Sequence, residues 1–304
     1  MAKLENRATG LGVELPSHCL CGRTPLALVR LEHAAASREH AVLEWARHAW
    51  RIRDLSTRNG TFVNGRSCSE AWQELCAGDE LAFGADDEAW VLVDDTAPPP
   101  AAIASDGTIR MGRGDLLLLP DDEAPEVSVQ RKGNTWILDR GDGVSAAESG
   151  TQIALGEATW ELLLPSGTPL TSTAAGARAP HLGSLRAVFE FDRTEEHVRL
   201  TLRGDEEDIA LPSRAFHHML LVLARARVHD RKVRGLSEAE SGWIDSLELA
   251  RMLGARPDKV NLDVFRARKL LAEHGVAGAA NVIERRSDSR QLRVGFRELD
   301  LVPL

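Results

Sequence analysis

The amino-acid sequence predicts a multidomain protein with an all-β sandwich, a second and shorter β-sandwich, and a C-terminal α+β domain. Three observations lead to this prediction. Short apolar runs separated by Gly, Asn, Asp and Ser clusters recur along the first 165 residues, which is typical of β-sandwiches. Two proline-containing stretches without apolar periodicity, 96–102 and 165–184, divide the 304 residues into three segments. Beyond the second stretch the apolar spacing becomes helical.

The first segment, residues 10–95, is predicted to be all β. Its strand-like runs lie at 27–31, 41–45, 50–54, 81–83 and 90–93. The second segment, residues 102–165, repeats four short motifs of the first in the same order, and Trp50 with the strand it begins is echoed by Trp136. This repetition predicts a duplicated sandwich with a shorter second copy. Residues 166–184 are rich in Pro, Gly, Ser and Thr and predict a flexible linker.

The third segment, residues 185–304, has a different pattern. Strand-like runs at 187–191, 198–202 and 208–211 precede helical runs at 214–225, 246–253 and 258–273. A polar turn at 285–290 then separates two short strands, 282–284 and 291–294. Three helices followed by a basic hairpin form the outline of a winged helix-turn-helix domain.

Three motifs in the first segment combine residue types that suit a phosphate ligand. In chain order they are Gly22-Arg23, Ser37-x-x-His40 and Asn59-Gly60-Thr61-x-x-Asn64. A phosphate dianion favours a guanidinium such as that of Arg23, and Ser37 adds a hydroxyl and a backbone N–H. Asn59 carries an amide donor and an acceptor that can hold a peptide backbone. Each motif alone is a common turn sequence, so the interpretation depends on their joint occurrence.

Together these motifs resemble a forkhead-associated (FHA) domain, a phosphothreonine-peptide reader, over about residues 12–95. The resemblance implies a phosphopeptide site made by Arg23, Ser37, Arg38, Thr57, Arg58 and Asn59. It also implies that the site is supported by Gly22, His40, Gly60, Thr61 and Asn64. In this interpretation His40 is an internal strut that does not touch the ligand. The two Asn-Gly pairs favour the tight turns that shape the loop.

The second segment departs from this pattern. Residues 125–130 stand where Ser-x-x-His should fall, and residues 140–145 replace the Asn-Gly-Thr loop. Arg113 remains from the Gly-Arg motif, but the negative charges of Glu126 and Asp142 would repel a phosphate. We therefore predict that residues 102–165 form a degenerate FHA-like β domain that serves packing or spacing and binds no phosphopeptide.

The third segment carries a local excess of positive charge. Residues 256–297 hold 10 basic and 5 acidic side chains, although the net charge of the chain is −9. The helical run 259–271 resembles the recognition helix of OmpR-type response-regulator winged helices, and the likeness extends over about 185–304. Such a helix fits the DNA major groove. We expect phosphate contacts from Arg256, Lys259, Arg266, Arg268, Lys269, Arg285, Arg286 and Arg290.

Composition limits the other possibilities. Hydrophobic residues make up 43% and charged residues 27% of the chain, as in globular proteins. The longest apolar run is far shorter than the roughly 20 residues of a membrane span, and the N-terminus lacks the apolar core of a signal peptide, so we expect a cytoplasmic protein with no membrane partner. The four cysteines predict neither a disulfide framework nor a metal site. Nucleotide-binding and protease motifs are absent, so we expect no cofactor and no enzyme activity.

These features predict a bacterial transcriptional regulator. Its FHA domain would dock a partner threonine-phosphorylated by a Ser/Thr kinase, and its winged helix would bind double-stranded promoter DNA. The alternative is a phospho-dependent adaptor whose winged helix binds protein rather than DNA.

The charge is distributed unevenly along the chain. Residues 1–184 carry 16 basic and 26 acidic side chains (net −10), and residues 185–304 carry 21 and 20 (net +1). A further hypothesis is therefore that the acidic N-terminal part folds back and masks the basic face of residues 256–297. A flexible linker favours independent domains instead. The sequence does not predict the oligomeric state.

Overall fold

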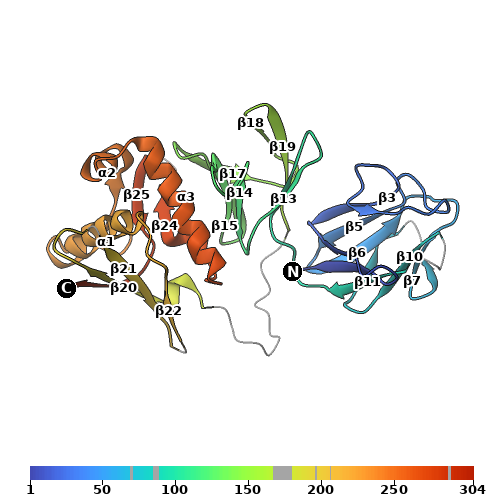
Figure 1. Ribbon diagram of the computed structural model, residues 1–304, viewed down its shortest axis with the longest axis horizontal. Coiled ribbons are helices and arrows are strands. Elements are labelled where there is room, and N and C mark those ends of the chain that lie inside the picture. Colours follow the sequence, from blue (N-terminus) through green and yellow to red (C-terminus); the bar gives the residue numbers. More distant parts are fainter. Residues whose placement is uncertain (69–70, 85–88, 167–179, 196, 206, 287–288) are drawn as a thin grey trace. The chain divides into compact units, whose positions relative to one another are not determined.

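The computed structural model describes residues 1–68, 71–84, 89–166, 180–195, 197–205, 207–286 and 289–304 (Figure 1). The chain divides into two compact units. The first unit comprises Met1–Met111 and Glu148–Thr171, and the second comprises Gly112–Ala147 and Ser172–Leu304. Most of the predicted linker, residues 167–179, lies outside the described residues, so its flexibility stays a prediction. No helix in the described ranges combines the length and the apolar character needed to cross a membrane.

The first unit contains the expected all-β sandwich. One sheet has the order β2-β1-β11-β10-β7-β8, with strands β1 (Lys3–Asn6), β2 (Gly12–Glu14), β7 (Thr61–Val63), β8 (Arg66–Cys68), β10 (Glu80–Phe83) and β11 (Ala89–Asp94). The facing sheet has the order β4-β3-β5-β6-β9, with strands β3 (His18–Gly22), β4 (Val29–Arg30), β5 (Ala41–Ala46), β6 (Ala49–Asp54) and β9 (Gln73–Leu75). In β6, buried residues alternate with half-buried ones, as expected for a strand that covers a core. Trp50 of one sheet and Trp90 of the other share that core.

A third sheet completes the first unit. Its order is β13-β12-β19-β18, with strands β12 (Ala101–Ala104), β13 (Ile109–Met111), β18 (Gln152–Leu155) and β19 (Ala158–Leu163). The second unit begins with a sheet of order β14-β15-β16-β17, with strands β14 (Leu116–Leu119), β15 (Val127–Lys132), β16 (Thr135–Asp139) and β17 (Val144–Ala147). The boundary between the units therefore falls inside the predicted segment 102–165. A second FHA-like domain stays a prediction.

The remainder of the second unit is α+β. Its sheet β22-β21-β20-β26 contains β20 (Arg186–Phe191), β21 (Val198–Arg203), β22 (Asp208–Ala210) and the C-terminal strand β26 (Glu298–Pro303), which pairs parallel to β20. Three helices follow, α1 (His217–Lys232), α2 (Ser246–Met252) and α3 (Pro257–Glu273). The hairpin consists of β24 (Ile283–Arg285) and β25 (Gln291–Val294), and β23 (Ile244–Asp245) extends it. Short 3-10 helices occur at Leu182–Ser184 and Ala279–Val282.

Local sequence explains how these helices begin and end. The side chain of Asp245 accepts the backbone N–H groups of Leu247 and Glu248 and so caps α2. Gly254, with a φ of 59°, supplies the left-handed residue that ends α2, and Pro257 occupies the first turn of α3. The elements follow the predicted order of strands, three helices and hairpin, while their assignment to the winged helix-turn-helix type stays a prediction.

Candidate functional site

Two loops of the first unit are brought together at Gly22. A Cβ added at this glycine would lie 2.2 Å from the backbone oxygen of Arg38, so only glycine permits the approach. Directly after it, Arg23 N–H donates to Ser37 O at 3.0 Å, and Thr24 N–H donates to Arg38 O at 2.9 Å. The close backbone contact therefore places Arg23 beside Ser37, although they are fourteen positions apart in the chain.

Arg23 is exposed at the surface of this loop pair. Its Nε donates to the backbone oxygen of Ala36 at 2.6 Å, which orients the guanidinium. Within the described part of the chain, its two terminal amino groups make no hydrogen bond or ion pair. They are available for the bidentate recognition of an anion that guanidinium geometry favours.

His40 lies buried between two loops. Its Nδ1 accepts the backbone N–H of Ser37 at 2.8 Å, and its Nε2 donates to the backbone oxygen of Gly60 at 3.1 Å. These roles require the neutral ring. Burial lowers the pKa of His40 below 6.5, which favours that form. The ring also meets Phe83 edge-on, with centroids 5.7 Å apart. The side chain thus joins the Ser37 loop to the Gly60 loop from inside the domain.

Asp54 organises the second of these loops. Its carboxylate accepts the hydroxyls of Thr57 at 2.7 Å and Thr61 at 2.6 Å, and the backbone N–H of Thr57 at 2.8 Å. Burial raises the pKa of Asp54, but the hydrogen bonds from Thr61 and Thr57 outweigh it and hold that pKa below 3.8. Asp54 is not among the residues that the sequence motifs predicted to support the site. Its position three residues before Thr57, typical of a side-chain-to-backbone turn, is the signal that identifies it.

The remaining predicted residues divide into exposed and supporting ones. Arg38, Arg58 and Asn59 are exposed, and Asn59 Nδ2 donates to Ala35 O at 2.9 Å. Thr57 is half-buried, and its hydroxyl also accepts Gly60 N–H at 3.0 Å, so it stabilises the loop from within.

Asn64 lies at a separate turn. Its side chain donates to Asp79 Oδ1 at 2.7 Å and accepts Glu80 N–H at 2.9 Å. Asn64 therefore holds the turn between β7 and β8 against the start of β10. It belongs to a different turn from the loops that carry Arg23 and Ser37.

The cations predicted to contact DNA do not all lie on the surface of the second unit. Arg256, Arg266 and Arg290 are exposed, and Arg266 Nη1 lies 3.7 Å from Asp263 Oδ1. Lys259 pairs with the same Asp263 at 2.7 Å. Lys269 is half-buried. Residues 287 and 288 of the predicted polar turn lie outside the described residues.

Arg268 and Arg285 were expected to contact phosphate, but they are buried and cannot do so in the described arrangement. Arg268 donates to Ala280 O at 2.9 Å and Ile283 O at 3.0 Å, and its Nη1 lies 2.9 Å from Asp139 Oδ2. Arg285 Nε lies 3.2 Å from Asp139 Oδ1. The reason is that β16 supplies a buried carboxylate, which local sequence patterns do not reveal. Burial raises the pKa of Asp139, but the charges of Arg268 and Arg285 outweigh it and keep the pKa below 3.8.

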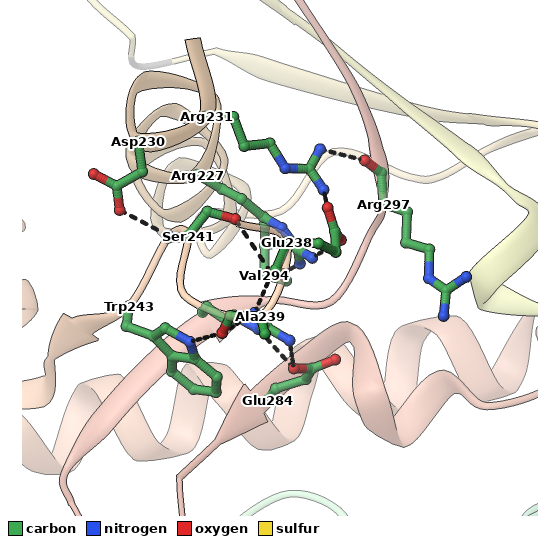
Figure 2. Close-up of polar contacts among 12 residues, drawn as sticks. Arg227, Asp230, Arg231, Glu238, Ala239, Ser241, Trp243, Glu284, Val294 and Arg297 are labelled. Carbon is green, nitrogen blue, oxygen red and sulfur yellow. Dashed lines mark hydrogen bonds and ion pairs between the residues drawn. The ribbon is translucent and has the colours of Figure 1, made fainter. Parts of the chain in front are cut away.

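A cluster of arginines joins α1 to the hairpin (Figure 2). Arg227 of α1 donates to the backbone oxygen of Val294 and to the carboxylate of Glu238, which Arg231 also contacts. Burial, together with the charges of Arg293 and Arg231, lowers the pKa of Arg227 to about 10. These contacts hold the chain between α1 and α2 against the hairpin.

Arg286 and Arg293 both lie over the ring of Trp243, each 4.4 Å from its centroid. Arg286 also donates to Gln291 Oε1 at 2.8 Å. The predicted cation Arg286 is therefore held where β24 enters the turn of the hairpin, whereas Arg290, just before β25, is exposed.

Comparisons with known proteins agree with the geometry of the first unit. The family model of the FHA domain matches residues 19–84, and these residues form an FHA domain. The match includes neither residues 102–165 nor residues 185–304. No curated protein matches the chain.

Three similar solved structures each cover 30% of this chain. One comes from a structural and functional analysis of phosphothreonine-dependent FHA domain interactions (25% identity, 92% of that chain, TM-score 0.27). Another is Mycobacterium tuberculosis EmbR in complex with a low-affinity phosphopeptide (27% identity, 23% of that chain, TM-score 0.28). The third is the N-terminal FHA domain of Saccharomyces cerevisiae Rad53p with a phosphothreonine peptide (20% identity, 90% of that chain, TM-score 0.27).

Proposed function

We propose that this protein acts by binding rather than catalysis, and that its FHA domain reads phosphothreonine in a partner phosphorylated by a Ser/Thr kinase. One observation carries the proposal. The buried ring of His40 holds the Ser37 loop and the Gly60 loop together, and this arrangement leaves Arg23 and Asn59 exposed above it. The site is organised by contacts inside the protein before any ligand arrives, which lowers the entropic cost of binding.

The chemistry of the exposed groups fits this ligand. The guanidinium of Arg23 can form charge-assisted hydrogen bonds to a phosphate dianion, with Arg38 and Arg58 adding positive charge nearby. The hydroxyl of Ser37 can donate a further bond. The backbone N–H of Ser37 already bonds to His40, so it does not serve the ligand in this arrangement.

The experiment is a titration of the full chain with a fluorescent phosphothreonine peptide, read by anisotropy. The unphosphorylated peptide and the phosphoserine peptide are its matched controls. The proposal requires that the phosphothreonine peptide binds more tightly than both. Equal binding of the phosphorylated and unphosphorylated peptides would overturn it.

We also propose that the second unit binds duplex DNA, which would make the protein a transcriptional regulator. The supporting observation is the set of predicted cations that remain outside the core, namely Arg256, Lys259, Arg266, Lys269, Arg286 and Arg290. If about four phosphates are neutralised, the logarithm of affinity should fall against the logarithm of salt concentration with a slope of about −4. A salt-insensitive interaction, or no interaction with DNA, would favour the adaptor. In that case α3 would bind protein, as it already does within this chain, where its Arg268 pairs with Asp139 of β16.

A further inference from the structure

One face of α3 lies against the sheet β14–β17 inside the second unit (Figure 1). Phe265 of the helix packs with Leu118 of β14 in a small apolar cluster. One turn earlier, Asn261 approaches Gly141 so closely that a Cβ added there would lie 2.6 Å from Asn261 Nδ2. Asn261, Phe265 and Arg268 follow one another at helical spacing and therefore share a face. Because the sheet covers this face, it is closed to any other ligand in the described arrangement.

The centre of this contact is a carboxylate held between two guanidiniums. Asp139 Oδ2 lies 2.9 Å from Arg268 Nη1, and Asp139 Oδ1 lies 3.2 Å from Arg285 Nε. The exposed fractions of the side chains of Asp139, Arg268 and Arg285 are 0%, 0% and 1%. Arg268 of α3 and Arg285 of the hairpin thus both bind one carboxylate of the sheet. Arginines bind phosphate by the same charge-assisted hydrogen bonds.

The charges of this cluster are incompletely balanced. Two guanidiniums share the single carboxylate of Asp139, and their other partners are the neutral groups Ser128 Oγ, Asn261 Oδ1 and backbone carbonyls. In the described part of the chain, Arg285 Nη1 is buried without a hydrogen-bond partner. Burial, aided by the nearby charge of Arg285, lowers the pKa of Arg268. A polyanion with successive phosphates would supply one negative charge to each arginine.

The apolar part of the contact is small. It consists of Leu116, Leu118, Phe265 and Ala280, with Ala272 beside them. The core of the α+β part has other buried residues, and those on α3, among them Val260, Val264 and Leu271, lie on another face of the helix. The half-buried Ala272 packs against both clusters. Because the two clusters are distinct, the sheet can leave α3 without dismantling the core that folds the helix.

We propose that Arg268 and Arg285 form an anion site for successive backbone phosphates of duplex DNA, and that Asp139 occupies this site so that the sheet β14–β17 competes with DNA for α3. The inference rests on the proposed DNA binding of the second unit and states how that binding is regulated. In the closed form, DNA meets only the cations at the rim, such as Lys259 and Arg266. A closed form favoured a hundredfold would weaken the apparent DNA affinity about a hundredfold.

The test compares two substitutions in the full chain that remove the same charge. Asp139→Asn removes the carboxylate from the cluster, whereas Asp142→Asn removes an exposed carboxylate three residues later. DNA affinity is measured for both by anisotropy with one labelled duplex at one salt concentration. We expect Asp139→Asn to bind about tenfold or more tightly than the wild type, and Asp142→Asn to match the wild type.

A second measurement reports the opening of the contact directly. Ser128 is fully buried and bonds to Arg268, so Ser128→Cys places a thiol inside the interface. Its rate of alkylation, followed by peptide mass spectrometry, should rise with Asp139→Asn and with saturating DNA. If circular dichroism shows that Asp139→Asn does not fold, Leu118→Gln is used in its place, because it weakens the same contact from the apolar side.

The outcomes separate this inference from the proposal on which it rests. Equal DNA affinity of the wild type and Asp139→Asn overturns the competition but leaves DNA binding intact. Faster alkylation without any gain in affinity also overturns it. If neither protein binds DNA at low salt, the proposed DNA binding itself fails. Tighter binding by Asp139→Asn, with faster alkylation in the presence of DNA, supports the competition.

Discussion

The backbone N–H of Ser37 donates to Nδ1 of His40 at 2.8 Å, and this bond fixes the loop beside Arg23 from inside the domain. The opposite ring nitrogen reaches Gly60 O, so one side chain joins both loops of the candidate phosphopeptide site. A buried group with two assigned hydrogen bonds leaves the loops little freedom. The affinity for a ligand therefore depends on residues that do not touch it.

Arg23→Ala should weaken phosphothreonine-peptide binding by the full chain more than tenfold. Hydrogen bonds to charged groups contribute about 1.5–3 kcal/mol each, and this substitution removes the guanidinium beside Ser37. Isothermal titration calorimetry measures the effect. Arg47→Ala, in the turn at the other end of β5, removes the same charge and should leave affinity unchanged. An unchanged affinity for Arg23→Ala would place the phosphate elsewhere.

Lowering the pH should destabilise the loops of the candidate site, because protonated His40 can no longer accept the Ser37 N–H. Its pKa in the folded protein is below 6.5, so the unfolded chain binds this proton more readily than the folded one. The stability that His40 contributes is therefore present above pH 6.5 and is lost as pH falls through its folded pKa. A pH titration of its ring resonances by NMR should give a midpoint below 6.5. A midpoint at or above that value contradicts the neutral strut.

Gly22→Ala should destabilise the first unit by about 1–3 kcal/mol, because the new methyl group meets the backbone of Arg38 and overpacks a rigid contact. Gly12→Ala is the control. Its Cβ would also lie 2.2 Å from a neighbour, but that neighbour is the flexible end of the Lys3 side chain, which can move. Thermal denaturation followed by circular dichroism compares the two. Similar losses for both variants would count against the close approach at Gly22.

Arg268→Ala should destabilise the second unit by about 3–5 kcal/mol, since it leaves the carboxylate of Asp139 buried with only one of its two guanidiniums. Arg266→Ala removes an arginine from the exposed side of the same helix and should cost less than about 1 kcal/mol. Hydrogen exchange in increasing urea, read from peptides of the second unit, measures both. Equal effects would show that the buried cluster adds no stability.

The full chain should bind a single phosphothreonine peptide. Arg113 remains from the Gly-Arg motif, but Glu126 and Asp142 lie in the segments that replace the other motifs. Calorimetric stoichiometry should therefore be one, and Arg113→Ala should leave it and the affinity unchanged. Two peptides per chain would show that residues 102–165 retain a working site.

The FHA domain over residues 19–84 could be predicted from local sequence motifs, which also name the residues of its candidate site. The motifs from Gly22 to Asn64 are local, because turns and loop contacts require particular residue types at short spacing. The family match over residues 19–84 confirms the domain. Short apolar runs separated by turn residues also predicted the β-rich character of the chain, since a strand is short and a turn interrupts it. Asp54 was missed although the same local turn chemistry identifies it.

Which of the predicted cations lie at the surface depends on contacts between distant parts of the chain. Arg268 and Arg285 pair with Asp139, and those contacts span 129 and 146 positions of the chain. An arginine on a basic helix has the same sequence pattern whether water or a buried carboxylate faces it. The division of residues 102–165 between two units is likewise invisible to periodicity. Apolar spacing records that a face is buried, whereas the partner that buries it depends on how distant segments meet.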